Sequence, residues 1–292
     1  MSEIKYINRK SGGVEEENVP GGGSMRFIYG NPIGKLSLWI LIKRKFFTAL
    51  FGNYMNSKSS AKKIPSFVDT HQIDLNEYIV PEGGYKTFND FFYRHIKPEY
   101  RPIDNGVVSP ADGRVFVFPT LEKAHKHFIK GEPFDLKKFL KDDSLVSKYK
   151  DGSMCIVRLA PVDYHRYHFP VSGVASESKL INGYYYSVSP IALQKNMKIF
   201  WENKREYMTV SSETNGDVLI CDVGATLTGG IRQTYTSSNE VQKGDEKGYF
   251  FFGGSTLILL FEKDRIEFSD DLIENSAKGL ETLLKMGETI GR

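Results

Sequence analysis

The chain has 292 residues, of which 40% are hydrophobic and 26% charged, the composition of an ordinary globular protein with a buried core. Its formal net charge of +3 is too small to indicate a nucleic-acid partner, so we expect none. The two cysteines, Cys155 and Cys221, form no closely spaced pair, and we expect neither a disulfide nor a metal site.

A basic and hydrophobic segment occupies residues 31–68, which contain lysine and arginine but no aspartate or glutamate. At helical spacing Trp39 and Phe47 lie on a broad apolar face, and residues 43–45 form a basic cluster. Such a helix is typical of an anionic membrane interface, although a helix packed on the protein's own core would show the same pattern. The uncharged run at residues 36–42 is too short to span a bilayer.

A short helix is predicted at residues 87–94, where Thr87 can cap the N-terminus and Asp90 lies in the first turn. Two prolines follow closely and interrupt the chain. We therefore predict an N-terminal helical region at residues 1–100 and a β-rich region at residues 101–292.

The β-rich region consists of short apolar runs separated by turn residues. The clearest runs are residues 113–118, 154–159, 218–223 and 255–261. A helix predicted at residues 135–140 and the segment from Leu272 onward interrupt them. The pattern indicates an α+β fold in which N-terminal amphipathic helices pack on a predominantly antiparallel β core.

The sequence Ser-Pro-Ala-Asp-Gly at residues 109–113 has two interpretations. It contains the residues of an ordinary turn, in which Asp112 would bond its own backbone. Alternatively, Asp112 is a carboxylate held between strands, ready to orient an imidazole.

Two of the six histidines, His165 and His168, lie close together among tyrosine and arginine side chains. They would share a face of a helix but point in opposite directions on a strand. A zinc site is not indicated, because no cysteine is near and no His-Glu-x-x-His sequence is present. Histidines with structural hydrogen bonds are more common than catalytic ones, so both interpretations stay open.

The sequence Gly253-Gly254-Ser255-Thr256 separates two apolar, strand-like runs. Glycine accepts backbone conformations closed to other residues, so a strained bend can be held there. Ser255 could then turn its hydroxyl toward the Gly254 carbonyl. A simple β-hairpin turn would show the same sequence.

In combination these elements resemble the phosphatidylserine decarboxylases, a family of pyruvoyl-dependent enzymes. The resemblance covers nearly the whole chain. Its main motifs are residues 88–94, 109–113, 163–166, 168–170 and 253–256. Small departures are Gly253, where some members have leucine, and Ser189, where asparagine is common; neither residue carries a reacting atom.

The resemblance implies a self-processing proenzyme. Asp112 would orient His168, and His168 would take the proton from Ser255 so that its oxygen attacks the Gly254 carbonyl. Elimination from the resulting ester would convert Ser255 into a pyruvoyl cofactor. The products would be a β chain of residues 1–254 and an α chain of residues 255–292, held together as a heterodimer.

The resemblance also implies decarboxylation of phosphatidylserine to phosphatidylethanolamine through a Schiff base to the pyruvoyl group. His165 would donate a proton or position the substrate carboxylate. A lipid substrate favours the membrane interpretation of the basic segment, so residues 33–55 are predicted to anchor the protein peripherally to the anionic cytoplasmic face of the cell membrane. A higher homo-oligomer, such as a dimer, is also implied.

Two alternatives remain from the sequence. The same pyruvoyl chemistry could act on another serine-headgroup lipid or on a small amino acid, which would not need a membrane helix. The chain could also be a non-catalytic membrane-binding β module in which the Gly-Ser step is only a turn. A denaturing gel separates the pyruvoyl enzymes from the non-catalytic module, because only a pyruvoyl enzyme would be cut in two.

Overall fold

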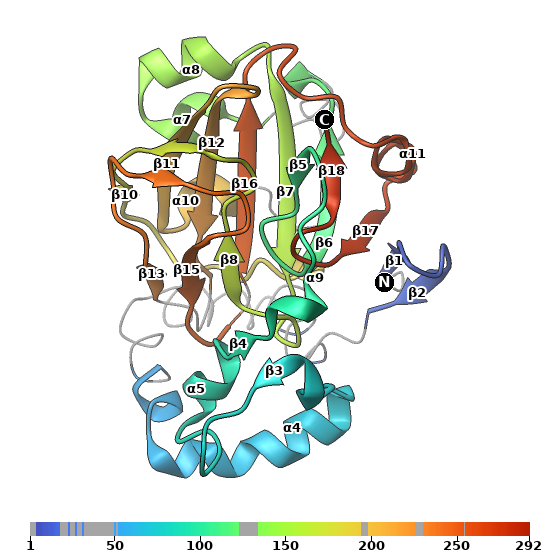
Figure 1. Ribbon diagram of the computed structural model, residues 1–292, viewed down its shortest axis with the longest axis vertical. Helices are drawn as coiled ribbons and strands as arrows, with labels where there is room; N and C mark the ends of the chain where they lie inside the picture. The colour runs from blue at the N-terminus through green and yellow to red at the C-terminus, as the bar shows by residue number, and fades with distance from the viewer. Residues whose placement is uncertain are drawn as a thin grey trace.

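A computed structural model describes residues 4–17, 23, 27, 31, 50, 52–122, 134–193, 198–225, 230–253 and 255–292. The predicted α+β fold is confirmed: a large, mostly antiparallel sheet carries short helices, and a smaller helical layer lies at one end (Figure 1). The predicted basic helix at residues 33–55 lies almost entirely outside the described residues.

The central sheet has the strand order β14-β9-β11-β12-β16-β7-β6-β17-β1-β2, and β10 pairs with β11. All its neighbouring strands are antiparallel except β1 and β17. The strands are β1 (Lys5–Asn8), β2 (Val14–Glu16), β6 (Gly113–Phe118), β7 (Ser153–Leu159), β9 (Gly173–Ala175), β10 (Lys179–Ile181), β11 (Arg205–Ser212), β12 (Gly216–Val223), β14 (Glu240–Val241), β16 (Ser255–Phe261) and β17 (Glu281–Leu284).

A second sheet of three strands, ordered β13-β15-β8, packs on one face of the central sheet. Two further strand pairs, β18-β5 and β3-β4, complete the β structure of the described residues. The bounds are β3 (Tyr78–Ile79), β4 (His95–Ile96), β5 (Val107–Val108), β8 (Arg166–His168), β13 (Ile231–Gln233), β15 (Glu246–Phe250) and β18 (Thr289–Gly291).

Helices cover the opposite face and the lower end of the central sheet (Figure 1). Side chains of α7, α8 and α10 pack there against Ile156, Ile258 and Leu260. The helices are η2 (Lys58–Lys63), α4 (Ile64–His71), η3 (Leu75–Glu77), α5 (Phe88–Phe92), η4 (Pro98–Tyr100), α7 (Leu136–Leu140), α8 (Asp143–Tyr149), α9 (Pro190–Leu193), α10 (Ile199–Glu202) and α11 (Asp270–Ala277).

Strand β16 is buried on both faces, which explains its uninterrupted apolar sequence. Leu257 and Leu259 face the three-stranded sheet, whereas Ile258 and Leu260 face the helical layer. The predicted bounds of β6 and β16 are confirmed, and those of β7 and β12 are confirmed to within two residues. At the first residue of β16, Ser255 therefore occupies a fixed place between β12 and β7.

The predicted helix at residues 87–94 is confirmed as α5. The Thr87 side chain accepts a hydrogen bond from the Asp90 backbone N–H, as the sequence indicated, and Asp90 lies in the first turn. The neighbouring Phe88, Phe91 and Phe92 are buried, so a single turn of helix is stabilised mainly by aromatic packing.

The division into a helical region 1–100 and a β-rich region is corrected at its beginning. Strands β1 and β2 belong to the central sheet, because β1 pairs in parallel with β17. Glu17 follows β2, and its carboxylate is bound by the buried Arg158 and Arg114. The first strands are therefore held by residues far away in the sequence, which a local helical or polar pattern does not reveal.

The contact between the two sheets contains a fully buried ion pair, Lys247 Nζ to Asp222 Oδ2 at 2.5 Å. Burial raises the pKa of Asp222, and the Lys247 ammonium acts in the opposite direction. Gln233 contributes hydrogen bonds to both groups. A pair of this kind is costly to break, because one charge would remain buried without a partner.

Replacing Lys247 with Met in an uncut Ser255→Ala chain should lower the free energy of unfolding by about 3–5 kcal/mol. The double variant Asp222→Asn/Lys247→Met should recover most of that loss, because no isolated charge remains. Urea denaturation measures both values. The matched control is Lys278→Met, which removes an exposed ion pair with Glu274 and should change little. A Lys247→Met chain as stable as this control would contradict the prediction.

Candidate active site

The structure brings the sequence-predicted motifs together at one end of the central sheet. Ser255, the first residue of β16, pairs with Leu159, the last residue of β7. The chain continues from β7 to the two histidines, and the His168 N–H donates to the Pro110 carbonyl at 2.8 Å. The turn carrying Asp112, the histidine segment and the start of β16 are thus neighbours.

A glycine is required at the end of the Ala-Asp-Gly turn. A Cβ at Gly113 would lie 2.8 Å from the carbonyl oxygen of Arg158 in β7, closer than real Cβ contacts. Strand β6 can therefore approach β7 closely at this point, which fixes the position of the preceding Asp112.

The Ser255 side chain is fully buried, and its Oγ has no hydrogen-bond partner among the described residues. A buried hydroxyl without a partner costs about 1–3 kcal/mol, so native proteins rarely leave one. The Thr256 hydroxyl is in the same condition. The start of β16 thus holds two buried hydroxyls that form no hydrogen bond with the described residues, at a cost to stability.

The segment before Ser255 is hydrogen-bonded to α5. The Phe252 backbone N–H donates to the Asn89 side chain at 2.9 Å, and Asn89 is itself buried. Gly253 has a φ of 137°, a conformation that favours glycine. The predicted bend is therefore present at Gly253, whereas Gly254 lies outside the described residues.

His165 is fully buried beside this segment, with its ring centroid 3.9 Å from that of Phe92. Its Nδ1 lies 3.0 Å from the Asp163 carbonyl oxygen, and Nε2 has no hydrogen-bond partner within the described ranges. Because the Asp163 carbonyl can only accept, a proton on Nδ1 would complete this hydrogen bond and leave a lone pair on Nε2. Hydrogen bonding with the Gly253 backbone raises the pKa of the ring. Burial lowers the pKa of His165 to about 3, so the ring is neutral at pH 7.

His168 differs from His165 because both of its ring nitrogens are engaged. Nδ1 lies 2.8 Å from the Gly244 carbonyl oxygen, and Nε2 lies 3.1 Å from the Tyr164 hydroxyl. Burial lowers the pKa of His168 as well. The hydrogen bond between Tyr164 and His168 was not predicted from the sequence. The place of Tyr164 in the same motif, directly before His165, was the available signal.

Asp112 accepts a dense set of hydrogen bonds, and they come from other groups than His168. Arg101 binds both carboxylate oxygens, at 2.9 and 2.7 Å, while Lys285 Nζ lies at 3.2 Å and the Met286 N–H at 2.8 Å. Burial alone would raise the pKa of Asp112, but these cations and hydrogen bonds hold it well below its usual range. Its negative charge raises the pKa of both histidines as a minor cause. Orientation of His168 by Asp112 stays a prediction.

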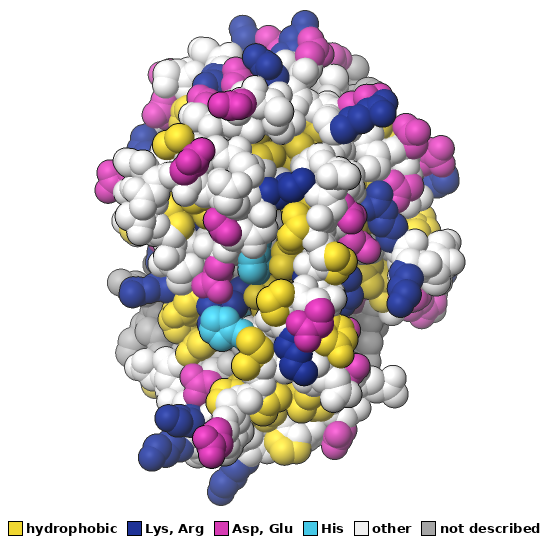
Figure 2. Space-filling view, viewed as in Figure 1, with side chains coloured by type: hydrophobic (Ala, Val, Ile, Leu, Met, Phe, Trp, Pro, Cys, Tyr) yellow, Lys and Arg dark blue, Asp and Glu magenta, His cyan; other side chains and the backbone are white. Residues whose placement is uncertain are grey.

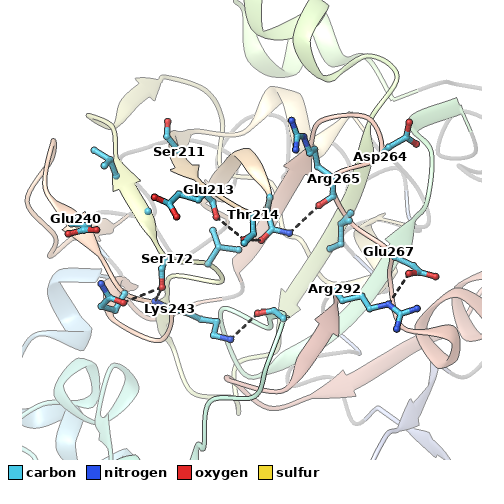
Figure 3. A pocket seen from close by; sticks show the side chains of 18 residues that line it. Ser172, Ser211, Glu213, Thr214, Glu240, Lys243, Asp264, Arg265, Glu267 and Arg292 are labelled. Carbon is cyan, nitrogen blue, oxygen red and sulfur yellow. Dashed lines mark hydrogen bonds and ion pairs between the residues drawn. The ribbon is translucent and has the colours of Figure 1, made fainter.

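A wide pocket of about 1070 Å³ lies elsewhere, between β9, β14 and the turn that joins β11 to β12 (Figure 3). Neither the two histidines nor Asp112 and Ser255 line it. Lys243 donates to backbone carbonyls on its rim, and Arg292 pairs with Glu267. These cations already have partners, and the pocket offers no counterpart to the buried serine and histidine.

The start of a central strand thus combines a buried hydroxyl, that of Ser255, with a nearby chain segment that carries a buried, neutral imidazole, that of His165. Comparison with known proteins identifies the class. The family model "Phosphatidylserine decarboxylase" matches residues 88–292. Proteins named phosphatidylserine decarboxylase proenzyme are 49% identical in Fusobacterium nucleatum subsp. nucleatum, covering 100% of this chain and 98% of that protein, and 47% identical in Clostridium novyi, covering 99% of each.

A similar protein of the same name in Chlamydia muridarum is 42% identical over 99% of this chain and 97% of its own length. The chain therefore belongs to the phosphatidylserine decarboxylase family. The resemblance seen in the sequence is confirmed, and the non-catalytic alternative is set aside.

From the ion pairs and hydrogen bonds of Asp112, we predict that its contribution to the stability of the folded chain depends on pH. Replacing Asp112 with Asn in a Ser255→Ala chain should lower Tm by several degrees at pH 7, because Arg101 and Lys285 lose their shared partner. The folded-state pKa lies below the unfolded value of about 3.9, so this stabilisation is complete above that value and is lost as the pH falls further. The difference in Tm between the two chains should therefore shrink below about pH 4. A constant difference from pH 7 to pH 3 would contradict this assignment.

Proposed function

We propose that this chain cuts itself between Gly254 and Ser255 and then decarboxylates phosphatidylserine to phosphatidylethanolamine. The observation that carries the proposal is the buried, unpartnered Oγ of Ser255 at the start of β16. Membership of the family supplies the reaction class. The geometry suggests which residues perform each part of it.

His165 is the better-placed base for the first proton transfer. Its Nε2 has no side-chain hydrogen bond recorded among the described residues, its ring is neutral, and hydrogen bonding with the Gly253 backbone, next to the proposed cleavage site, raises its pKa. His168 would first have to release Tyr164 or the Gly244 carbonyl. We therefore propose that His165 takes the proton of Ser255. His168 would hold Tyr164 and the backbone at Gly244 in place through its two hydrogen bonds.

Once deprotonated, the Ser255 oxygen attacks the Gly254 carbonyl, and the acyl group moves from nitrogen to oxygen. Loss of the Cα proton of residue 255 and cleavage of its Cβ–O bond then release Gly254 as a free carboxylate and leave dehydroalanine. Water hydrolyses the dehydroalanine to a keto-acyl cap on residue 255 and releases ammonia. The φ of 137° at Gly253 is readily adopted by glycine, so the chain can bend just before the reacting bond without a side-chain clash.

The residues around Ser255 fit a pyruvoyl group made from it, because the hydroxyl that must be lost has no hydrogen bond to break. When present, that group supplies a ketone that condenses with the substrate amine and accepts the electron pair left by carbon dioxide. Phe92 and Phe252, with ring centroids 4.9 Å apart, provide apolar walls near His165. A carboxylate is poorly solvated beside such walls, which favours its loss. His165 is also the candidate proton donor to the product carbon.

The two chains would remain associated after cleavage. Strand β16 hydrogen-bonds to β12 and β7 along its length, and β17 continues the same sheet. Asp112 binds Lys285 and Met286 across the future chain boundary. The α chain is therefore proposed to stay as a central part of an α/β heterodimer.

Membrane contact is proposed for the lower end of the molecule. Hydrophobic side chains gather on the lower part of one face, over the region of β3, β4 and α5 (Figure 2). Ile79 and Val80 are 52% and 47% exposed there. Tyr54 is also exposed, and Lys63 Nζ lies 5.7 Å from its ring centroid. No helix in the described part of the chain is long and apolar enough to cross a bilayer, so we propose peripheral binding.

The assignment of the base is tested by the rate of self-cleavage. His165→Gln should slow cleavage roughly 100-fold or more, the usual contribution of a general base, whereas His168→Gln should have a smaller effect. The time course of chain separation on a denaturing gel measures both rates, and mass spectrometry identifies residue 255. Ser255→Ala is the uncut control. If His168→Gln were the slower variant, His168 would be the base; an uncut but active wild-type chain would refute self-processing.

The membrane assignment is tested by the triple variant Lys43→Glu/Arg44→Glu/Lys45→Glu. It should lose binding to anionic vesicles, since each basic residue near such a surface contributes about 1 kcal/mol. Vesicle flotation measures binding, and neutral vesicles show the contribution of the apolar residues alone. The control Lys137→Glu/Lys138→Glu/Lys141→Glu changes an equal charge around α7, near the opposite end of the molecule (Figure 1). Equal binding by both triple variants would contradict anchoring by residues 43–45.

A further inference from the structure

Arg94 is a buried cation for which the described residues provide no counterion. It follows α5, and its side chain belongs to the fully buried set of the described residues. One nitrogen, Nη1, donates to the Phe91 carbonyl at 3.2 Å. The other two, Nε and Nη2, are buried with no hydrogen-bond partner in the described part of the chain.

Other buried arginines of this protein show what a structural guanidinium looks like. Arg205 donates to four backbone carbonyls, and Arg158 binds the carboxylates of Glu17 and Glu281. Both are satisfied by the protein itself. Arg114 also has one buried nitrogen, Nε, without a hydrogen bond among the described residues, but its charge is paired with Glu17 and Asp163. A buried charge without such partners is costly, so the incomplete shell of Arg94 needs a physical explanation.

The position of Arg94 links it to the proposed active site. Its guanidinium lies over the rings of Tyr78 and Phe91, at 4.1 and 4.7 Å from their centroids. Burial is the main reason for the low pKa of His165, and the positive charge of Arg94 lowers it further. The cation is therefore within electrostatic range of the residue that we assign as the base.

The two free nitrogens form a recognition edge. In a planar guanidinium, the N–H bonds of Nε and Nη2 point the same way along one side and match two oxygens of a phosphate or a carboxylate. Stacking on Tyr78 and Phe91 holds the plane of the group. The geometry favours one anionic group with two oxygens at this edge.

We infer that Arg94 binds the phosphodiester of the substrate headgroup through Nε and Nη2. This inference rests on the proposed function, because it assigns a substrate group to the same site. The substrate would supply the counterion that the protein lacks. Arg94 is thus a binding residue that sets the position of the headgroup relative to Ser255 and His165.

The phosphodiester is a better partner than the substrate carboxylate for a chemical reason. The carboxylate gives up its negative charge as carbon dioxide leaves, so a guanidinium bound to it would stabilise the ground state and slow the reaction. The phosphodiester keeps its charge throughout. Binding it costs nothing in the chemical step and leaves the carboxylate to the apolar walls formed by Phe92 and Phe252.

Arg94→Gln and Arg94→Lys test the inference in a steady-state assay of carbon dioxide release. Arg94→Gln should raise KM for phosphatidylserine roughly 10- to 100-fold, as expected for a lost pair of hydrogen bonds to a charged group, with a much smaller change in kcat. The KM of Arg94→Lys should lie between those of the wild type and Arg94→Gln, since lysine keeps the charge but not the paired donors. Arg232→Gln removes an exposed cation of β13 and is the matched control.

Two soluble inhibitors separate the phosphodiester from the carboxylate. Glycerophosphoethanolamine has the phosphodiester but no carboxylate, and L-serine has the carboxylate but no phosphodiester. Arg94→Gln should weaken inhibition by glycerophosphoethanolamine at least tenfold and leave inhibition by L-serine unchanged. The reverse pattern would overturn the inference, and so would an unchanged KM in both Arg94 variants.

The extent of self-cleavage, measured on a denaturing gel, separates a loss of substrate binding from a failure to fold. Arg94→Lys should be cut as completely as the wild type, and its KM then decides the question even if Arg94→Gln does not fold. An active wild type with insensitive Arg94 variants would overturn only this inference. An inactive, uncut wild type would overturn the proposed function instead.

Discussion

The backbone hydrogen bonds that hold β16 between β12 and β7 are the constraint on which the rest of the structure depends. The proposed reaction breaks the chain just before this strand, yet residue 255 must stay in place to act afterwards. A central strand meets both needs, because its position is fixed by neighbours on each side and by two apolar faces. Cutting the chain there removes one covalent bond and leaves the burial of β16 intact.

Low polarity around the site explains the state of its ionisable groups. Burial lowers the pKa of both histidines, which keeps the rings neutral and one lone pair available. Asp112 remains charged in the same region only because Arg101, Lys285 and the Met286 N–H surround it. Its contacts join the two future chains, so this carboxylate serves assembly of the site as well as its electrostatics. Such a role differs from that of a carboxylate bonded directly to a catalytic imidazole.

Much of the fold could be predicted from local sequence. Strands β6 and β16 have continuous apolar runs, and Thr87 with Asp90 marks the start of α5, so their patterns were sufficient. The strands β1 and β2 could not be predicted, because they are short, polar and completed by β17 near the other end of the chain.

The same distinction holds for the site. The Gly-Ser step and both histidines were predicted as site residues from their residue types and spacing, and their roles stay a prediction. The hydrogen-bond partners of the His168 ring were not predicted, because Gly244 and Tyr164 reach His168 only in the folded chain. Asp112 likewise meets Lys285 and Met286 through contacts that span most of the sequence. Hydrogen-bond partners at such separations depend on strand order, which local patterns do not determine.

Three of the groups proposed to act have buried polar atoms without a hydrogen bond among the described residues. Asp112, Arg158 and Arg205 are buried and well satisfied by the protein, whereas Ser255 Oγ, His165 Nε2 and two nitrogens of Arg94 are buried and have no hydrogen-bond partner in the part of the chain that the structure describes. Each unsatisfied group costs about 1–3 kcal/mol, which is substantial beside the total stability of a domain. Other buried atoms, such as the Tyr207 hydroxyl, also lack a partner there, so position has to be considered as well. The Phe250 N–H donates to the His165 carbonyl just before Ser255, and the charge of Arg94 lowers the pKa of His165. The three groups are consistent with a site whose hydrogen bonds are completed by the substrate and by the reaction itself.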